Sequence, residues 1–263
     1  MAKTERVDTL LVNRGFAKDL SQAKRMVMAG EVRVEGQLVH KPSMSYSPEV
    51  EITLDQGPPY VSRAGEKLAA ALEHFEIPLA GRVCADVGAS TGGFTDCLLQ
   101  HGAEKVYAVD VGYGILDWKL RQDERVVVME RTNARYLYQL PEAAAVITMD
   151  VSFISLDRLL PVSVNWFPPE GGETIALVKP QFEAHREESA AGEGVIDDKR
   201  VHLRVLEEVS RAAQEMGYGL QDVLPSPLRG VKGNQEYLAW YRYPGEPRDD
   251  LEAFIRSAVP GLR

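Results

Sequence analysis

The amino-acid sequence predicts an α/β protein, in which a doubly wound and mostly parallel sheet follows a small α+β unit. Between residues 62 and 263, short apolar runs alternate with helical patterns. A turn rich in glycine joins one of these runs, Arg82 to Val87, to the next helical pattern. Residues 1–55 differ, because two short helical patterns there precede short alternating segments. We therefore expect two domains of different architecture.

In residues 1–55, the apolar spacing from Val7 suits a short helix that ends at Gly15. Asp19 or Ser21 can cap a second helix, which Gly30 ends. Strands are expected after it at 32–34, 38–39 and 49–54. Residues 56–61 contain one glycine and two prolines in succession, which favours an extended linker between the domains.

The second domain, residues 62–263, opens with a helix that runs through Phe75. Strands are expected near 82–87, 105–109, 126–129, 146–149, 175–178, 218–224 and 236–241. Further helices are expected near 92–101, 156–166 and 198–216. The segment 183–197, rich in Glu, Ala and Gly, is predicted to be a mobile loop near the active edge. Strands that alternate with helices in this way indicate a doubly wound sheet.

Residues 85–96 carry the most informative local pattern, a strand, a glycine turn and the start of a helix. Glycine lets the backbone approach a ligand closely, and the first turn of a helix offers free N–H groups. Asp110 ends the next strand, where a carboxylate can accept both hydroxyls of a ribose. Gly88 is followed by Gly92 and Gly93, so the dinucleotide pattern is absent. The turn therefore favours a smaller adenosyl ligand, such as S-adenosylmethionine, over an ordinary βαβ connection.

Ligands of open parallel sheets bind at the carboxyl ends of the strands. The polar residues expected at that edge are Asp86, Asp110, Asp150 and Lys179, with Asn133 shortly after the third strand. A tight turn over 230–234 suggests a hairpin, and an antiparallel last strand would place Glu236 at the same edge. Lys67, on the preceding helix, could reach across.

Two lysines and two carboxylates, Lys67, Asp150, Lys179 and Glu236, would then surround one pocket. Such a group suits the deprotonation of a weak acid such as a ribose hydroxyl, with lysine as base and carboxylates that orient it. Each residue also has an ordinary interpretation, as a loop cap, a solvated lysine or an exposed strand residue. Asp150 and Lys179 stand out because each interrupts a strongly apolar strand.

Composition sets further bounds. The net charge is −9, while residues 1–55 hold eight basic and eight acidic residues, so the remainder carries the whole excess. A local basic face remains compatible with this balance, and RNA binding outside a specific site should be weak and dependent on salt. The start of the chain lacks the apolar segment of a signal peptide, and no apolar run approaches a membrane span. Cys84 and Cys97 are expected to be buried and unpaired, which fits a cytoplasmic protein.

The first domain resembles the S4 RNA-binding domain, on residues 6–12, 21–27 and 30–36. The resemblance implies that basic side chains of this unit face RNA phosphates. The residues expected to bind RNA are Arg6, Arg14, Lys24, Arg25, Arg33 and, in the second domain, Arg63. The alternative is that they are ordinary solvated charges on amphipathic helices.

Nearly the whole chain resembles the hemolysin A (TlyA) family, through residues 60–68, 86–96, 149–156, 178–183 and 233–237. That family joins an S4 domain to an FtsJ-like, Rossmann-like class I methyltransferase domain. The resemblance implies methyl transfer from S-adenosylmethionine to 2′-hydroxyls of ribosomal RNA, at cytidine, with no metal. Its catalytic Lys-Asp-Lys-Glu tetrad falls on Lys67, Asp150, Lys179 and Glu236. Its cofactor site falls on Asp86, Gly88, Ala89, Ser90, Thr91, Gly92, Gly93, Phe94, Asp110, Asn133 and Asp150.

Two other functions stay open from the sequence. The family name suggests a cytolysin, which would need a membrane-spanning helix, a set of barrel strands or a strongly amphipathic face. A ribosome-binding assembly factor with a vestigial cofactor site is the other. Ribosomal subunits are the expected partner of the enzyme, and no obligate protein partner and no membrane are expected.

Overall fold

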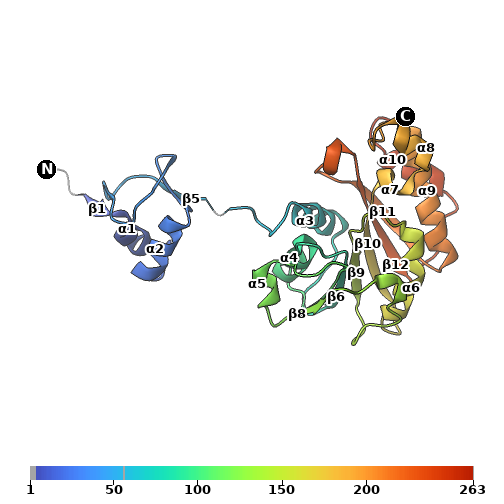
Figure 1. Ribbon diagram of the computed structural model, residues 1–263, viewed down its shortest axis with the longest axis horizontal. Helices are drawn as coiled ribbons and strands as arrows, with labels where there is room; N and C mark the ends of the chain where they lie inside the picture. The colour runs from blue at the N-terminus through green and yellow to red at the C-terminus, as the bar shows by residue number, and fades with distance from the viewer. Residues whose placement is uncertain (1–3, 56, 263) are drawn as a thin grey trace. The chain divides into compact units, whose positions relative to one another are not determined.

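The computed structural model describes residues 4–55 and 57–262, which form two compact units (Figure 1). The boundary between the units along the chain falls between residues 59 and 60. Residue 56 of the expected linker lies outside the described residues, as do residues 1–3 and 263 at the ends of the two expected domains.

The first unit contains two helices and short strands, as the sequence predicts. Its elements are β1 (Glu5–Arg6), α1 (Val7–Asn13), α2 (Leu20–Met28), β2 (Val32–Val34), β3 (Gln37–Leu38), β4 (Ser45–Tyr46) and β5 (Ile52–Leu54). The strands form an antiparallel sheet in the order β3-β2-β5 and a separate β1-β4 pair. The Asp19 carboxylate caps α2 by accepting the Gln22 N–H at 2.7 Å. Leu10, Leu11 and Val27 help to form a core of its own.

The second unit is built on a seven-stranded sheet in the order β11-β12-β10-β9-β6-β7-β8. Its strands are β6 (Val83–Val87), β7 (Lys105–Val109), β8 (Val126–Met129), β9 (Val146–Met149), β10 (Gly172–Val178), β11 (Gly219–Pro225) and β12 (Tyr237–Tyr243). The five strands from β6 to β10 are parallel to one another, whereas β12 runs antiparallel to both β10 and β11. The predicted hairpin and its direction are confirmed.

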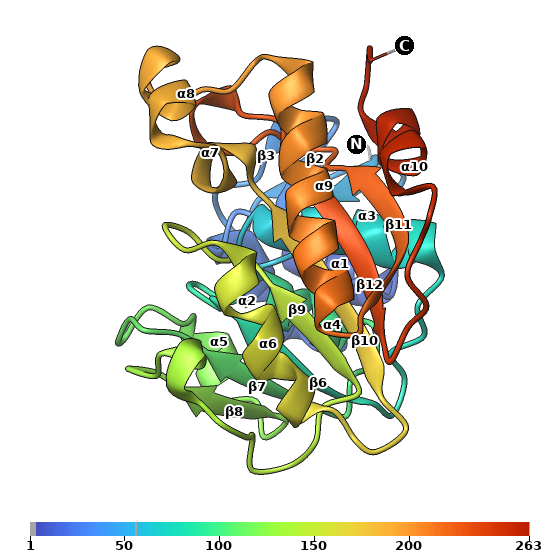
Figure 2. The ribbon, with the colours of Figure 1, turned by 90° about the vertical axis from the view of Figure 1, so that its right-hand side faces the viewer.

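Helices cover both faces of this sheet and create two apolar cores (Figure 2). The first face carries α3 (Ala64–Phe75), α4 (Gly93–Gln100) and α5 (Trp118–Arg121), and the second carries α6 (Leu160–Ser163), α9 (Lys199–Glu215) and α10 (Leu251–Ala258). Two short helices, α7 (Pro180–Glu183) and α8 (Arg186–Ala191), follow β10. The doubly wound architecture predicted from the sequence is confirmed.

Two local predictions were wrong. The helix expected over 156–166 is divided into a 3₁₀ turn at Leu156–Arg158, the short α6 and a second 3₁₀ turn at Val164–Trp166. Pro161 lies in the first turn of α6, and because it has no N–H and disfavours a helical residue before it, one continuous helix cannot pass through it. The segment 183–197, expected to be a loop, contains α8.

The strand register places the carboxyl ends of the parallel strands and the start of β12 along a single edge of the sheet. Val87 lies opposite Val109 and Met149, and Val178 lies opposite Tyr237, the first residue of the antiparallel β12. The residues that follow β6, β7, β9 and β10, and the residue that precedes β12, therefore share this edge. They are Gly88, Asp110, Asp150, Lys179 and Glu236.

Candidate active site

Two ion pairs lie at this edge of the sheet. Lys179 Nζ is 2.6 Å from Asp150 Oδ1, and Lys67 Nζ is 2.5 Å from Glu236 Oε2. Both lysines are 9% exposed and Glu236 is 2% exposed. An isolated charge is costly to bury, so each lysine depends on its carboxylate partner. The four residues that the sequence placed together do converge.

Glu236 is held on several sides. Its second oxygen, Oε1, accepts a hydrogen bond from Gln181 Nε2 at 3.0 Å. A Cβ atom at Gly230 would lie 2.0 Å from the same oxygen, so only glycine fits there. Lys67 reaches the carboxylate from the first turn of α3. The Glu236 carboxylate thus has a fixed position at the start of β12.

Lys179 and Asp150 follow the adjacent strands β10 and β9 directly. Lys179 Nζ also donates to Ser152 Oγ at 3.2 Å and lies 5.8 Å from the Phe182 ring. The Asp150 N–H donates to the carbonyl of Val87 at 2.9 Å, which fixes the backbone where it leaves the strand. The Lys179 ammonium is therefore oriented by three neighbours at the edge.

A cavity of about 430 Å³ lies beside Asp150, and we call it the Asp110 cavity. Its polar residues include Asp110 and Asn133, and its apolar wall includes Val109 and Ile154. The complete lining is Val87, Gly88, Ser90, Val109, Asp110, Val111, Thr132, Asn133, Ala134, Asp150, Val151, Ser152, Phe153, Ile154 and Leu159. An apolar slot with a few polar groups at its edge is the usual form of a small-molecule site.

A smaller cavity of about 170 Å³, the glycine-turn cavity, adjoins it. The two cavities share Gly88, Ser90, Asp150 and Ser152. The other residues of the glycine-turn cavity are Ser62, Ala64, Ala89, Thr91, Gly93, Phe94 and Lys179. Together the two cavities offer space for an elongated ligand with an apolar ring system and a polar end.

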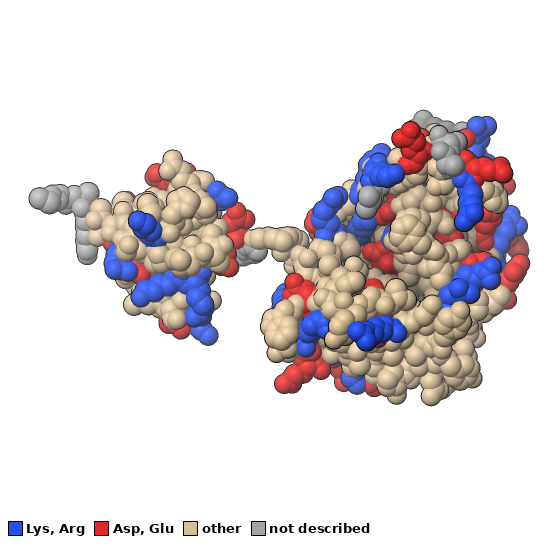
Figure 3. All heavy atoms as spheres, viewed as in Figure 1, with Lys and Arg blue, Asp and Glu red and all other residues tan. Residues whose placement is uncertain are grey.

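A third cavity of about 430 Å³, the Glu236 cavity, also has Lys179 in its lining. It is lined by Ser152, Phe153, Lys179, Gln181, Phe182, Ser189, Gly194, Lys232, Asn234 and Glu236. Lys179 and Ser152 line both this cavity and the glycine-turn cavity, so the two cavities adjoin at these residues. In Figure 3 the second unit is hollowed on the face shown, with acidic atoms inside the hollow and Lys and Arg around its rim.

Asp110 braces the glycine turn. Its two carboxylate oxygens accept the N–H groups of Ser90 at 2.8 Å and Gly112 at 2.6 Å. The turn itself needs unusual backbone, since φ is +81° at Gly88 and +98° at Gly92. The carboxylate at the end of β7 therefore fixes the shape of the turn as well as lining the Asp110 cavity.

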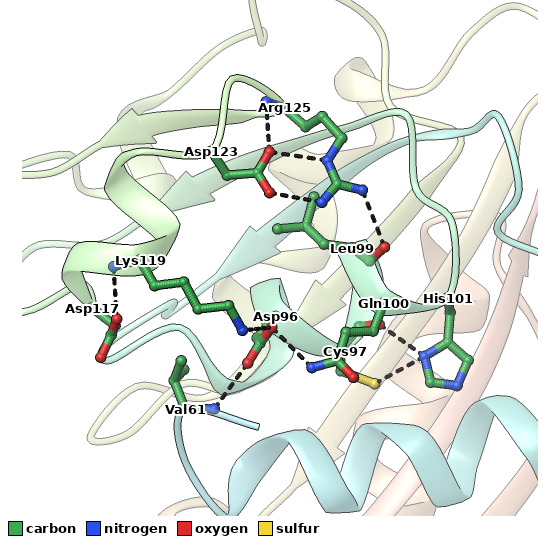
Figure 4. A network of polar contacts seen from close by, with 10 residues as sticks. All are labelled: Val61, Asp96, Cys97, Leu99, Gln100, His101, Asp117, Lys119, Asp123 and Arg125. Carbon is green, nitrogen blue, oxygen red and sulfur yellow. Dashed lines mark hydrogen bonds and ion pairs between the residues drawn. The ribbon is translucent and has the colours of Figure 1, made fainter. Parts of the chain in front are cut away.

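The segment that enters the second unit is anchored by Asp96 of α4 (Figure 4). The buried Asp96 carboxylate accepts the Val61 N–H at 2.9 Å and Gln100 Nε2 at 3.0 Å, and Lys119 Nζ lies 3.3 Å away. Ser62 is thereby held beside the turn, where a Cβ on Gly93 would lie 2.2 Å from Ser62 Oγ. One wall of the glycine-turn cavity depends on this anchor.

Comparisons with known proteins agree with this geometry. Residues 60–243 match the FtsJ-like methyltransferase family, and residues 5–52 match the S4 domain. The chain is 46% identical over 92% of its length to the 16S/23S rRNA (cytidine-2'-O)-methyltransferase TlyA of Mycobacterium tuberculosis, of which it covers 91%. The chain belongs to the TlyA family of FtsJ-like methyltransferases.

Other relatives of this TlyA-family chain carry a different name. Hemolysin A of Brachyspira hyodysenteriae is 39% identical, over 90% of the chain and 99% of that protein. The structure of a hemolysin-named protein from Streptococcus thermophilus is 40% identical with a TM-score of 0.71, and covers 98% of the chain and 96% of that structure. Fibrillarin of Methanococcus jannaschii, at 18% identity, a TM-score of 0.54, and 75% and 80% coverage, shares the fold alone. The expected Rossmann-like methyltransferase fold is confirmed.

No helix in the described part of the TlyA-family chain is long and apolar enough to cross a membrane. Residues 4–55 and 57–262 also contain no group of three or more His, Cys, Asp or Glu side chains that could hold a metal ion. Cys84 and Cys97 are buried and free, as the sequence predicts.

Two residues expected at the cofactor site do not line the cavities described above. Asp86 is fully buried in β6, where its carboxylate accepts hydrogen bonds from Thr95 at 2.7 Å and Thr148 at 3.2 Å. Gly92 packs against helix α5, since a Cβ there would lie 2.2 Å from Leu120 Cδ1. Asp86 and Gly92 therefore support the glycine turn through packing and hydrogen bonds without lining either cavity. The Glu236 cavity is also lined by Ser152, Phe153 and Gln181, which were not predicted as site residues. Each lies within three residues of Asp150 or Lys179, and this proximity is the signal in the sequence that could have identified them.

The basic residues expected to bind RNA differ in the contacts that their side chains already make within the protein. Arg14 donates to the carbonyl of Val50 at 2.6 Å and to that of Pro48. The remaining five are placed as follows: Arg6 pairs with Asp8 at 2.6 Å, Arg33 pairs with Asp55 at 2.9 Å, Arg25 contacts Ser21 at 2.9 Å, and Lys24 and Arg63 are exposed. Arg14 therefore has a structural role in the first unit, whatever else it contacts.

Burial raises the pKa of Asp86 to about 7, which makes stability depend on pH. The folded chain holds this proton to a higher pH than the unfolded chain, so wild-type stability should fall as pH rises from about 4 to about 7. In Asp86→Asn this slope is absent. The melting temperature of the variant relative to wild type should therefore rise through this window and level off above it. Thermal denaturation at a series of pH values measures the difference, and parallel curves would contradict the assignment.

Comparison of Arg14→Ala with Lys24→Ala should distinguish a basic residue that stabilises the first unit from one that contacts RNA. The first change removes the guanidinium from two backbone carbonyls and should lower the melting temperature of the first unit. The second removes an exposed charge, so it should leave the melting temperature unchanged. It should reduce the slope of log affinity for ribosomal RNA against log salt by about 0.7–0.9. Equal melting temperatures for Arg14→Ala and wild type would show that the two carbonyl contacts contribute nothing.

Proposed function

We propose that the chain transfers a methyl group from S-adenosylmethionine to the ribose 2′-hydroxyl of cytidine in ribosomal RNA. One observation carries the proposal: Lys179, paired with Asp150, lines both the glycine-turn cavity and the Glu236 cavity, while Asp150 lines the Asp110 cavity and the glycine-turn cavity. The names of the Mycobacterium tuberculosis and Campylobacter jejuni relatives, both cytidine-2'-O-methyltransferases, supply the substrate class.

The residues of the first two cavities fit S-adenosylmethionine. Asp110 would accept the ribose hydroxyls, because each of its oxygens has accepting capacity beyond the backbone N–H that it already bonds. Asn133 uses Oδ1 to accept the Arg135 N–H, so its amide nitrogen would face the adenine edge. Ser62, Thr91 and the first turn of α4 would hold the amino-acid end. The sulfonium of the cofactor supplies an electrophilic methyl group when it is bound.

The tetrad would act on the hydroxyl. We assign Lys179, which must be in its neutral amine form for this step, as the group that would take the hydroxyl proton. As the oxygen bonds to the methyl carbon, the bond from that carbon to the sulfonium sulfur would break and leave S-adenosylhomocysteine. Asp150 would hold Nζ in place. Glu236, which lines the Glu236 cavity and is held by Lys67, would orient the ribose there. Alignment of the oxygen with the methyl group contributes further, because the cavities fix both reactants before the reaction begins.

We propose that the S4 unit, residues 1–55, holds ribosomal RNA while the linker, residues 56–61, joins it to the methyltransferase domain, residues 62–263. The six basic residues that the sequence analysis assigned to RNA belong to this proposal. In Figure 3, Lys and Arg side chains gather on part of the first unit. A ribosomal substrate also implies that the protein acts in the cytoplasm.

Lys179→Met should lower the rate of methyl transfer to unmodified ribosomal subunits by about 10²–10⁴-fold, because the proton acceptor is lost. Binding of S-adenosylmethionine, followed by thermal shift, should persist. Lys105→Met is the matched control, since Lys105 pairs with Glu142 at the opposite edge of the sheet. The incorporation of labelled methyl groups into the subunits measures the transfer rate of each variant.

Three results would count against this proposal. A folded Lys179→Met variant with the wild-type rate would exclude Lys179 as the base. Tight binding of wild type to ribosomal subunits with no methyl incorporation would make the chain a non-catalytic assembly factor, and lysis of liposomes by the pure protein would favour a cytolysin.

Asp110→Ala should weaken S-adenosylmethionine binding by about 10–100-fold, the effect expected for lost hydrogen bonds to a charged acceptor. Asp123→Ala serves as the control, because Asp123 pairs with Arg125 before the start of β8, at the edge away from the cavities. Isothermal titration calorimetry gives both dissociation constants. Equal constants for the two variants would place the ribose elsewhere.

A further inference from the structure

We propose that Gln181 is a positioning residue, which holds the Glu236 carboxylate against Lys67 at the wall of the Glu236 cavity. The inference rests on the proposed function, because it concerns the geometry of the same tetrad. Gln181 does not belong to the four charged residues. It lies in α7, two residues after Lys179.

The hydrogen bonds of Glu236 divide between two donors. Gln181 Nε2 donates to Oε1 at 3.0 Å, and Lys67 Nζ donates to Oε2 at 2.5 Å. Gly230 closes the space next to Oε1, where even a Cβ atom would not fit. Rotation of the carboxylate would therefore break both hydrogen bonds at once. Without the amide, Lys67 is the one remaining donor among the described residues, and a single contact does not fix the plane of a carboxylate.

Helix α7 connects the two ion pairs. Lys179 precedes Pro180, the first residue of the helix, and Gln181 follows it. Pro180 has a restricted φ and is buried, which limits relative movement of its two neighbours. Lys179 contacts Asp150 and Gln181 contacts Glu236, so three consecutive residues set the separation of the two halves of the tetrad.

The Gln181 side chain buries a polar atom at a cost in folding free energy, which suggests that the amide is retained for its role beside Glu236. Its Oε1 is buried and has no hydrogen-bond partner among the described residues. Turning the amide over would place this oxygen against Glu236 Oε1, so the nitrogen must face the carboxylate. A methionine of similar length could fill the space with no unpaired polar atom. The amide oxygen therefore costs stability at this position, while the amide nitrogen fixes Glu236.

The test is Gln181→Met in the full chain, assayed with unmodified ribosomal subunits and labelled S-adenosylmethionine. We expect kcat to fall about 10–100-fold, because misplacement of a positioned group by about 1 Å has an effect of this size. KM for the subunits should stay within about threefold. The melting temperature should change little, because the variant removes a buried unpaired acceptor but also removes one donor from the buried Glu236 carboxylate. A merely structural role would instead lower the melting temperature and leave kcat unchanged.

Gln214→Met is the matched control. Gln214 also carries a buried amide atom, Nε2, without a partner among the described residues. It lies near the end of α9, which leads into β11 at the edge opposite the tetrad. Its replacement should leave both kcat and KM at wild-type values.

Crystal structures of wild type and Gln181→Met give a readout that does not depend on activity. In the variant we expect the Glu236 carboxylate to rotate and its distance from Lys67 Nζ to exceed about 4 Å, the limit of an ion pair. An unmoved carboxylate together with wild-type kcat would overturn the inference. If wild type transfers no methyl group, the proposed function is wrong, and the Glu236 position in the variant still decides whether Gln181 positions it.

Discussion

The antiparallel pairing of β12 with β10 is the constraint on which the candidate site depends. The five parallel strands β6 to β10 all end at one edge of the sheet. The start of β12 lies at this same edge only because β12 runs in the opposite direction. The register that sets Val178 opposite Tyr237 makes Lys179 and Glu236 neighbours across the edge. In a parallel strand, Glu236 would lie at the opposite edge, and Lys67 would be buried without a carboxylate.

The burial of Lys67, Lys179 and Glu236, with Asp150 half-buried beside them, explains why the residues at this edge allow so few alternatives. A buried pair gains little stability overall, whereas a buried lysine without its partner is strongly destabilising. Each lysine of the tetrad therefore accepts few arrangements of its neighbours. Lys179 has Asp150 and Ser152, and Lys67 has Glu236, which Gln181 and Gly230 confine in turn. The polar contacts cost stability but leave a single arrangement of groups around the cavities.

Sequence reasoning succeeded where one residue interrupts a strong pattern, as Asp150 and Lys179 interrupt apolar strands. Glu236 required the strand direction as well, which the turn over 230–234 suggested. Other outcomes depend on packing that no pattern records. Asp86 occupies the end of a strand like Asp110 yet points into the core between two threonines. Arg14 is exposed like a ligand-binding residue, but its guanidinium contacts carbonyls 34 and 36 residues away. Gln181 is neutral and lies in a helix of four residues, so nothing in its spacing marked it.

The charge distribution bears on how such a protein would select RNA. The first unit is neutral in sum and the rest of the chain carries −9, so general attraction to a polyanion is weak. Three of the six basic residues assigned to RNA already contact carboxylates or carbonyls of their own unit. Few phosphate contacts then remain, and affinity from counterion release is correspondingly small. If the proposed function holds, discrimination would come largely from the fit of one nucleotide to the Glu236 cavity, where its sugar would reach Lys179.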